Sequence, residues 1–394
     1  MTPVIAEICA SAPIDPTRGE FPMAVPLMNP RAQYGGLEAE LGSLVTEIIN
    51  GSGTFILGPN VKAFEAEAAE YLGVKHAIGV GNGTDALVIG LRALNIGQGD
   101  EVICPAYTFY ATGESIAAVN ATPVFADVDE RTFNLDVDSV RQRISGRTKA
   151  IMVVHLFGQP ADLAELRALA DEHGLALIED SAQGWGAHYQ GRKVGSFGDF
   201  ATFSFFPTKN LPCFGDGGMV TTNSDETAAL VRKLRFHGSV DKKVFELVGY
   251  NSRLDEIQAA ILRRLVKEVD GWNTHRAQVA AWYEEAGLGE LVTLPHVAED
   301  RSHIYHLYMV RTTNRDAIAA ACKERGVACA VYYDIASHLQ PVFAHLGAAP
   351  GDLPVTEAMG REGLALPMFA TMTREQVVEV VEAVRAGVPA TAAV

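Results

Sequence analysis

A lysine between two expected strands is the first residue of this sequence that could carry out covalent chemistry. Lys209 follows alternating aromatic and small residues at 200–206 and precedes a glycine-rich run at 215–218. The alternation predicts a half-buried strand that Pro207 ends, and a second short strand extends through Val220. The amine of such a lysine is either a solvated loop charge or a nucleophile that condenses with a carbonyl group. Lys209 alone does not distinguish the two.

A second polar group follows an apolar strand that ends near Glu179. It contains Asp180 and Gln183, at the position where open α/β sheets bind their ligands. Asp180 could keep a pyridine nitrogen protonated and Gln183 could donate to a phenolate-like oxygen; alternatively, Asp180 only caps a helix. Asp180 and Lys209 each end a strand of one expected sheet. A cofactor lying across the strand ends, such as pyridoxal phosphate bound by a Schiff-base lysine, needs this arrangement.

A glycine-containing turn at 81–84 joins an expected strand at 77–80 to a helix. Free N–H groups and the helix dipole make such a turn an anion site, although it could also be a plain turn with Thr84 as N-cap. It lacks the GxxxxGK[ST] pattern of a Walker loop. Ser204 is a phosphate ligand or a buried hydroxyl, and Phe109 stacks on an aromatic cofactor or belongs to the core.

The elements that must position these residues alternate between strand and helix. This alternation predicts a mostly parallel sheet with helices on both faces. The expected strands are 77–80, 101–104, 122–126, 150–154 and 175–179, and the expected helices are 37–49, 61–71, 109–120, 138–144, 163–172 and 225–236. A long helical stretch at 254–286, broken near Gly271, precedes a strand at 305–312, a helix at 315–325 and a strand at 328–333.

The chain of 394 residues is long enough for a large and a small domain. We expect a lead-in segment at 1–24, a large domain at 25–268 and a small C-terminal α/β domain at 269–394. The order of the elements places the boundary near the long helical stretch.

Composition argues against several other classes of protein. The net charge of −16 disfavours binding to nucleic acid or to an anionic membrane through bulk charge. The five scattered cysteines without a CxxC pair indicate a reducing cytoplasm, and neither a signal peptide nor a long apolar run is visible. We expect no metal site, because the histidines 237, 303, 306 and 338 form no HExxH pattern and suit hydrogen bonding in a cleft or core.

Eight ordered motifs across most of the chain, from about Pro26 to Pro367, give the sequence a specific resemblance. They are FILGP (55–59), GNGTDAL (81–87), PAYTFYAT (105–112), VHLFGQP (154–160), EDSAQ (179–183), SFFPTKNL (204–211), GDGGMV (215–220) and GYNSRLDEIQAAIL (249–262). With these motifs the chain resembles the DegT/DnrJ/StrS family of sugar aminotransferases, which are pyridoxal-phosphate (PLP) enzymes. The resemblance implies fold type I, the aspartate-aminotransferase-like α/β fold with a large mixed, mostly parallel sheet domain and a small C-terminal domain.

The resemblance also implies roles for the residues around the cofactor ring. Lys209 would form the internal aldimine with PLP and shuttle the proton. Asp180 would pair with the pyridinium nitrogen, Gln183 would contact the ring O3′, and Phe109 would stack on the ring.

The phosphate and the subunit arrangement are implied in the same way. Gly83, Thr84 and Ser204 would hold the phosphate. Asn251 would come from the partner subunit, so the resemblance implies a homodimer with shared active sites.

The implied reaction is transamination by a ping-pong mechanism, because Lys209 stands where related dehydratases carry histidine. L-glutamate would give its amine to a keto sugar linked to a nucleotide, and the motif at 249–262 with HLQP at 338–341 is similar to members that act on 3-keto sugars. Tyr332, Tyr333 and His338 are candidate sugar contacts.

Two segments depart from the family pattern, namely Pro212-Cys213 and the stretch at 331–338, and both could border the substrate. Two other functions fit the same fold. The protein could be an aminotransferase for a keto-cyclitol, or a non-catalytic regulatory protein.

Overall fold

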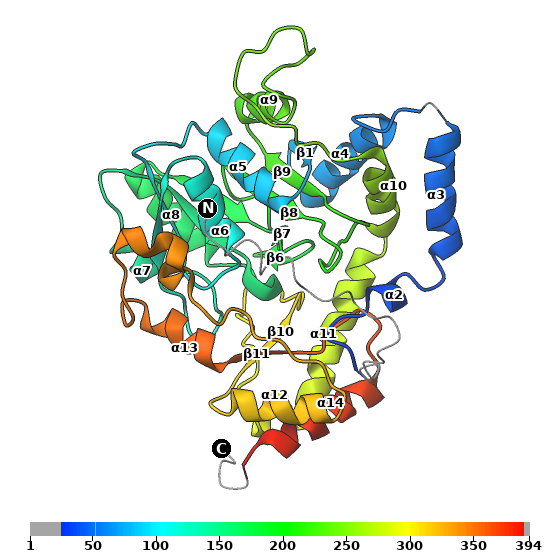
Figure 1. Ribbon diagram of the computed structural model, residues 1–394, viewed down its shortest axis with the longest axis vertical. Coiled ribbons are helices and arrows are strands. Elements are labelled where there is room, and N and C mark those ends of the chain that lie inside the picture. Colours follow the sequence, from blue (N-terminus) through cyan, green and yellow to red (C-terminus); the bar gives the residue numbers. More distant parts are fainter. Residues whose placement is uncertain (1–24, 52, 390–394) are drawn as a thin grey trace, which may run out of the picture.

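A seven-stranded mixed sheet forms the larger part of the computed structural model, which describes residues 25–51 and 53–389 (Figure 1). The strand order is β1-β9-β8-β5-β4-β2-β3. Only β9 runs antiparallel to its neighbours; the other pairs in this sheet are parallel. The strands are β1 (His76–Val80), β2 (Glu101–Pro105), β3 (Thr122–Ala126), β4 (Thr148–Val154), β5 (Ala176–Asp180), β8 (Phe200–Ser204) and β9 (Gly218–Thr222). This sheet confirms the expected mostly parallel arrangement of fold type I.

Alternating side chains bury the sheet on both faces. In β4, Ala150 and Met152 pack in one hydrophobic cluster, while Ile151 and Val153 pack in another. Successive side chains of a strand point to opposite faces, so a continuous apolar run marks a strand covered on both sides. The covering helices are α4 (Pro59–Leu72), α5 (Gly83–Ala93), α6 (Ala111–Ala118), α7 (Val137–Arg141), α8 (Leu163–His173), α9 (Asp225–Leu234) and α10 (Glu256–Leu265). α3 (Glu38–Asn50) lies beside α10.

A smaller antiparallel sheet of β10 (Tyr308–Arg311) and β11 (Gly363–Leu366) lies below the main sheet in Figure 1. It shares a separate hydrophobic cluster with α11 (Val269–Glu285), α12 (Arg315–Glu324) and α14 (Arg374–Gly387). Val25 is buried in this cluster and bridges to Val327. The domain boundary near residue 268 stays a prediction, and the predicted lead-in at 1–24 lies outside the described residues.

Three local expectations were wrong. The predicted strand at 328–333 is reduced to one bridge between Ala330 and Ala365. The long helical stretch breaks between α10 and α11, and Gly271 lies inside α11. β8 ends at Ser204, before Pro207. The bridge between Ala330 and Ala365 depends on pairing with a distant segment, which local propensity does not encode.

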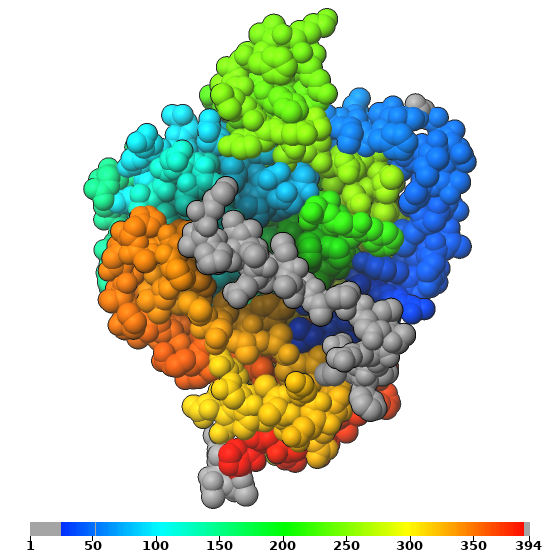
Figure 2. Space-filling model, in the orientation of Figure 1, coloured from blue at the N-terminus to red at the C-terminus, as the bar shows by residue number. Residues whose placement is uncertain are grey.

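The remaining elements are short or peripheral. They are α2 (Pro30–Gln33), η1 (Leu156–Gly158), β6 (His188–Tyr189), β7 (Arg192–Lys193), η2 (Leu288–Glu290), η3 (Ser337–Leu339), η4 (Pro341–Leu346) and α13 (Pro354–Glu362). A loop at 239–249, here named the projecting loop, rises beyond α9 and forms the tip of the molecule in Figure 2. Within the described ranges, no helix has the length and apolar character needed to cross a membrane.

Candidate active site

A cavity of about 450 Å³ lies where β5, β8 and the start of α5 meet. Nine of the predicted site residues line it: Gly83, Thr84, Phe109, Asp180, Gln183, Ser204, Lys209, Tyr332 and Tyr333. These residues come from segments up to 250 positions apart in the chain. The main sheet gathers them because parallel strands end at a common edge.

Two predicted residues lie elsewhere. Asn251 is exposed and does not line the cavity of its own chain. His338 is buried, lies 3.4 Å from Glu357 through Nε2, and borders a different surface cavity.

The turn before α5 is shaped as an anion cradle. Asn82, rather than Thr84, is the N-cap, since its side chain accepts a hydrogen bond of 2.8 Å from the N–H of Asp85. A Cβ on Gly83 would lie 2.8 Å from Cβ of Ser204, so only glycine fits there. Among the described residues, no group hydrogen bonds to the Thr84 hydroxyl, which leaves it available to a ligand at the positive end of the helix. The cradle therefore fits a phosphate group.

We expect Gly83→Ala to weaken binding of a phosphate-bearing cofactor by at least about tenfold, because the added methyl must displace Ser204 or the turn. Equilibrium titration of the cofactor-free protein with PLP measures this affinity. Gly146→Ala is the matched control, because its Cβ would have no neighbour within 4 Å. Equal affinities of the two variants would contradict the cradle.

Asp180 ends β5 as a buried carboxylate facing the cavity. Thr112 donates to its Oδ2 at 3.0 Å, and the N–H of Ala182 donates to its Oδ1 at 3.2 Å. Burial raises the pKa of Asp180, while these two donors and the charge of Lys209 oppose the rise. A buried carboxylate with spare lone pairs suits a cationic ring nitrogen, which would compensate its burial.

Glu179, the other acid of this motif, has a structural role. Its carboxylate accepts hydrogen bonds from the N–H groups of Gly195, Phe197 and Gly198 at 2.7–2.8 Å, and from Nε2 of His155 at 3.0 Å. Burial opposes its ionisation, but these donors outweigh burial and lower its pKa. Glu179 fixes the loop before β8 and does not line the cavity.

Lys209 lies in the loop after β8 and is partly accessible through the cavity. Burial lowers the pKa of its amine to about 8, although the negative charge of Asp180 opposes this shift. An amine with this pKa is partly unprotonated near neutral pH and is therefore nucleophilic. The lowered pKa and the place of Lys209 in the cavity therefore favour a nucleophilic amine over a solvated loop charge.

Gln183 is held from both ends of its amide group. Its Oε1 accepts from the N–H of Phe157 at 2.6 Å, and its Nε2 donates to the Tyr333 hydroxyl at 3.3 Å. No group in the described part of the chain accepts from the second N–H, which can therefore reach a ligand. The ring of Tyr333 lies 6.3 Å from that of Phe109, which is 58% exposed at the cavity and so can cover a planar ligand.

Several cavity residues were not predicted as site residues. Met28, Thr208, Asp216, His306 and Leu307 also line it. Asp216 lies in the GDGG run, and the sequence predicts a hydrogen-bonding role in a cleft or core for His306. Met28 lies outside the eight motifs, so the sequence around it gives no signal of a place in the site. Among the described residues, no cluster of three or more His, Cys, Asp or Glu side chains could hold a metal ion.

The fold type I sheet, together with a lysine, a carboxylate and an anion cradle at its strand ends, defines a site of the PLP-dependent aminotransferase class. The model of the DegT/DnrJ/EryC1/StrS aminotransferase family matches residues 37–385, and the chain belongs to this family. The predicted family and enzyme class are thereby confirmed.

Three similar proteins show the range of descriptions in this family. A pleiotropic regulatory protein of Geobacillus stearothermophilus is 48% identical over 91% of this chain and 97% of its own length. A UDP-N-acetyl-3-dehydro-α-D-glucosamine 3-aminotransferase of Acidithiobacillus ferrooxidans is 44% identical over 92% and 97%. The crystal structure of S. venezuelae DesV in complex with a ketimine intermediate superposes with a TM-score of 0.89 at 43% identity, covering 92% of this chain and 97% of that one.

Proposed function

We propose that this aminotransferase uses PLP to move the amino group of L-glutamate to the 3-keto group of a nucleotide-linked sugar. The observation that carries the proposal is the convergence of Lys209, Asp180 and Gln183 on one cavity beside the anion cradle. The same residues argue against a purely regulatory role, because a non-catalytic protein needs neither a lysine amine with a lowered pKa nor an acid aimed at the same cavity.

Each residue would do one task. Gly83, Thr84 and Ser204 would hold the phosphate at the start of α5. Asp180, held by Thr112, would keep the ring nitrogen protonated. When bound, PLP supplies an electron sink for the carbanion formed beside the transferred nitrogen.

The other groups would orient the ring and move the proton. Gln183 would donate to the ring oxygen, and Phe109 would cover the ring face. Lys209 would bind the cofactor through its amine. Once released, the amine would carry the proton between the α-carbon of the substrate and the cofactor carbon that bears the transferred nitrogen.

The substrate assignment is supported by the similar 3-aminotransferase, which is named for a UDP-linked 3-dehydro sugar. Tyr332 and Tyr333 line the cavity and remain candidates for sugar contacts. His338 borders another cavity, so a contact between His338 and the sugar has no support in the geometry of a single chain. L-glutamate as donor is carried over from the family resemblance.

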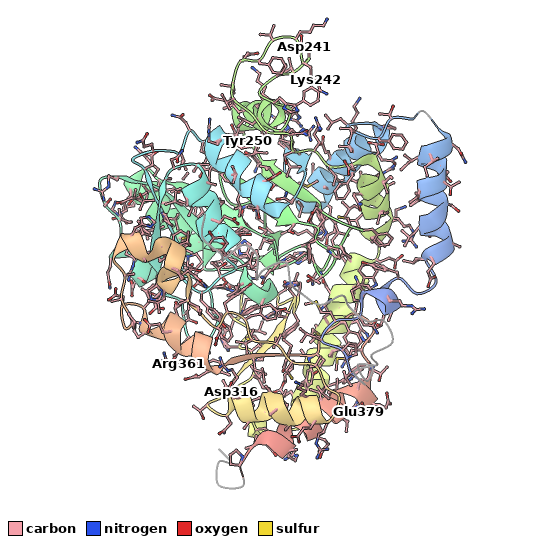
Figure 3. All side chains as sticks on the ribbon, in the orientation of Figure 1. Asp241, Lys242, Tyr250, Asp316, Arg361 and Glu379 are labelled. Carbon is pink, nitrogen blue, oxygen red and sulfur yellow. The ribbon has the colours of Figure 1, made fainter. Side chains whose placement is uncertain are left out.

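A second copy of the chain would complete the site. Four apolar side chains of the projecting loop are 58–82% exposed, namely Val240, Val244, Phe245 and Val248. Contact with a partner surface would remove this apolar area from water, which is favourable. Asn251 follows this loop, is exposed and does not line the cavity of its own chain. Figure 3 shows Asp241 and Lys242 at the tip, far from the body of the chain. We infer that the loop contacts the second copy and brings Asn251 to the partner's cofactor phosphate.

Mixed dimers test this sharing. In a dimer of one Asn251→Ala chain and one Lys209→Ala chain, one site combines the intact Lys209 of the first with the intact Asn251 of the second. We expect about half the wild-type activity per dimer, although each parent homodimer is strongly impaired. Purification through two different affinity tags isolates the mixed species. Activity no higher than the parental mean would contradict shared sites.

The absorption spectrum of the purified protein tests the proposed function. We expect the visible band of lysine-bound PLP to disappear on addition of L-glutamate and to return with a nucleotide-linked 3-keto sugar. D-glutamate is the matched donor control and a free keto-cyclitol is the matched acceptor control. A protein that stays colourless with PLP would refute PLP as the cofactor. A band restored only by the cyclitol would refute the nucleotide-linked sugar as the amino acceptor.

A further inference from the structure

His306 belongs to the wall of the cavity and to a line of buried amides beneath it. Its Nδ1 lies 3.2 Å from Oδ1 of Asn210, the residue that directly follows Lys209. Both His306 and Lys209 line the cavity. The orientation of the Asn210 amide therefore determines which nitrogen of His306 carries the proton.

Two acceptors fix that orientation. Nδ2 of Asn210 donates to Oδ1 of Asn273 at 2.7 Å and to the carbonyl of Ile304 at 3.1 Å. Asn273 is fixed in turn, because its own Nδ2 donates to the carbonyl of Trp185 at 3.1 Å. Backbone carbonyls only accept, so neither amide can be reversed without losing hydrogen bonds. Oδ1 of Asn210 must face His306, and Nδ1 of His306 must donate.

The opposite nitrogen is therefore an acceptor. Burial keeps the pKa of His306 well below its usual range, and the charges of Lys209 and Arg276 act in the same direction, so the ring is neutral. A neutral imidazole with its proton on Nδ1 has a lone pair on Nε2. Within residues 25–51 and 53–389, no group donates to this nitrogen.

His303 provides a contrast three positions earlier. Its Nδ1 accepts from the N–H of Tyr305 at 3.0 Å, so the proton of this neutral ring lies on Nε2. Burial lowers the pKa of His303 to about 3. His303 does not line the cavity. The two buried histidines thus have opposite tautomers, and only His306 can present an acceptor to the cavity.

We propose that His306 is a positioning residue for Lys209: the amine of Lys209 turns within the cavity that both residues line and donates to the open Nε2 of His306, a hydrogen bond that is not formed among the described residues. This inference rests on the proposed function. The hydrogen bond would direct the lone pair of Lys209 toward the reacting carbon, and it would stabilise the ammonium form while Lys209 holds the proton. The proton stays with Lys209 until it passes to the substrate carbon, and His306 remains neutral throughout.

Two amide variants separate the cavity role from a structural one. An asparagine amide reaches the position of Nδ1, so His306→Asn keeps the donor to Asn210 but removes the acceptor. A glutamine amide reaches the position of Nε2, so His306→Gln restores an acceptor toward Lys209 and loses the donor to Asn210. His303→Asn is the control for loss of a buried histidine outside the cavity.

The first readout is the pKa of Lys209 in the cofactor-free protein. Its acylation rate as a function of pH, followed by mass spectrometry of the peptide containing Lys209, reports this value. Burial opposed by the charge of Asp180 gives a pKa of about 8 without this hydrogen bond, so we expect a value about one pH unit higher in the wild type and in His303→Asn. In His306→Asn the pKa falls by about one pH unit, because the charged amine loses its acceptor, and in His306→Gln it stays near the wild-type value. Wild-type titration of His306→Asn would overturn the proposal.

Kinetics provide the second readout. We expect kcat to fall about tenfold in His306→Asn with unchanged KM for both substrates, and His306→Gln to recover most of that loss. A raised KM for the keto sugar without a change in the pKa of Lys209 would identify His306 as a substrate contact and overturn the proposal. A lowered kcat in His306→Gln together with a wild-type kcat in His306→Asn would show that His306 has a purely structural role, and would overturn the proposal.

The imidazole ¹⁵N shifts of the wild-type protein test the tautomers without any variant having to fold. We expect one neutral histidine protonated on Nδ1 with a lone pair on Nε2, insensitive to pH between 5 and 9 and perturbed by acylation of Lys209. Protonation of that ring on Nε2 would overturn the proposal. These shifts and the titration of Lys209 need no amino transfer, so a failure of the proposed function would be recognised separately.

Discussion

Lys209→Ala is expected to lower the rate of amino transfer by about 10⁴-fold. The variant loses the only amine that lines the cavity among the described residues, and that amine would serve both as the attachment point and as the proton carrier. Single-turnover absorbance changes after mixing with L-glutamate measure the rate. PLP would still bind through the cradle at Gly83 and Ser204, so the loss should lie in kcat.

Lys209→Arg is the matched control for charge. A guanidinium keeps the positive charge but stays protonated, so it cannot act as a nucleophile or a base. We expect it to be as inactive as Lys209→Ala. Activity within tenfold of the wild type in either variant would contradict the catalytic assignment.

Asp180→Asn is expected to lower the rate of proton abstraction by about 10²- to 10³-fold. The amide is nearly isosteric and can keep one hydrogen bond with Thr112 or Ala182, but it cannot hold a proton on the ring nitrogen by charge. The ring would then withdraw electrons less effectively. A primary kinetic isotope effect with α-deuterated L-glutamate, measured in wild type and variant, locates the loss in this step.

Glu179→Gln makes the same change of charge one residue away and is the control. Glu179 accepts four hydrogen bonds outside the cavity, so its replacement should destabilise the fold by about 3 kcal/mol and leave the isotope effect unchanged. Thermal unfolding measures that cost. An isotope effect that is the same in Asp180→Asn as in the wild type, at a near-normal rate, would contradict the pyridinium role.

The local pattern of apolar and polar residues was sufficient to predict most strands of the main sheet. The run at 150–154 is apolar throughout, and the structure buries Ile151 and Met152 on opposite faces of β4. Strand ends follow from this pattern, because a polar residue after an apolar run marks the edge of the sheet. Asp180 and Lys209 could therefore be placed at one edge before any contact was known.

The position of the anion cradle and the extent of strand pairing depended on tertiary contacts. Asn82 caps α5 through a local hydrogen bond, but the turn lies directly against β9, where a Cβ on Gly218 would lie 2.3 Å from the Asn82 carbonyl oxygen. The segment at 328–333 has strand-like composition, but it pairs only once, through Ala330 and Ala365. Backbone pairing of this kind joins residues far apart in sequence, so no short window of sequence contains it.

The sequence by itself determined the residue types of the chemistry: a lysine, an acid and a glycine turn at strand ends, in motifs specific enough to indicate the family. Only the tertiary structure decided their protonation and their partners. The pKa of Lys209 falls because packing removes water around it, and His306 takes one tautomer because Asn210 is held by Asn273 from a distant helix. Burial and hydrogen-bond direction are properties of the folded neighbourhood, and a linear sequence does not specify them.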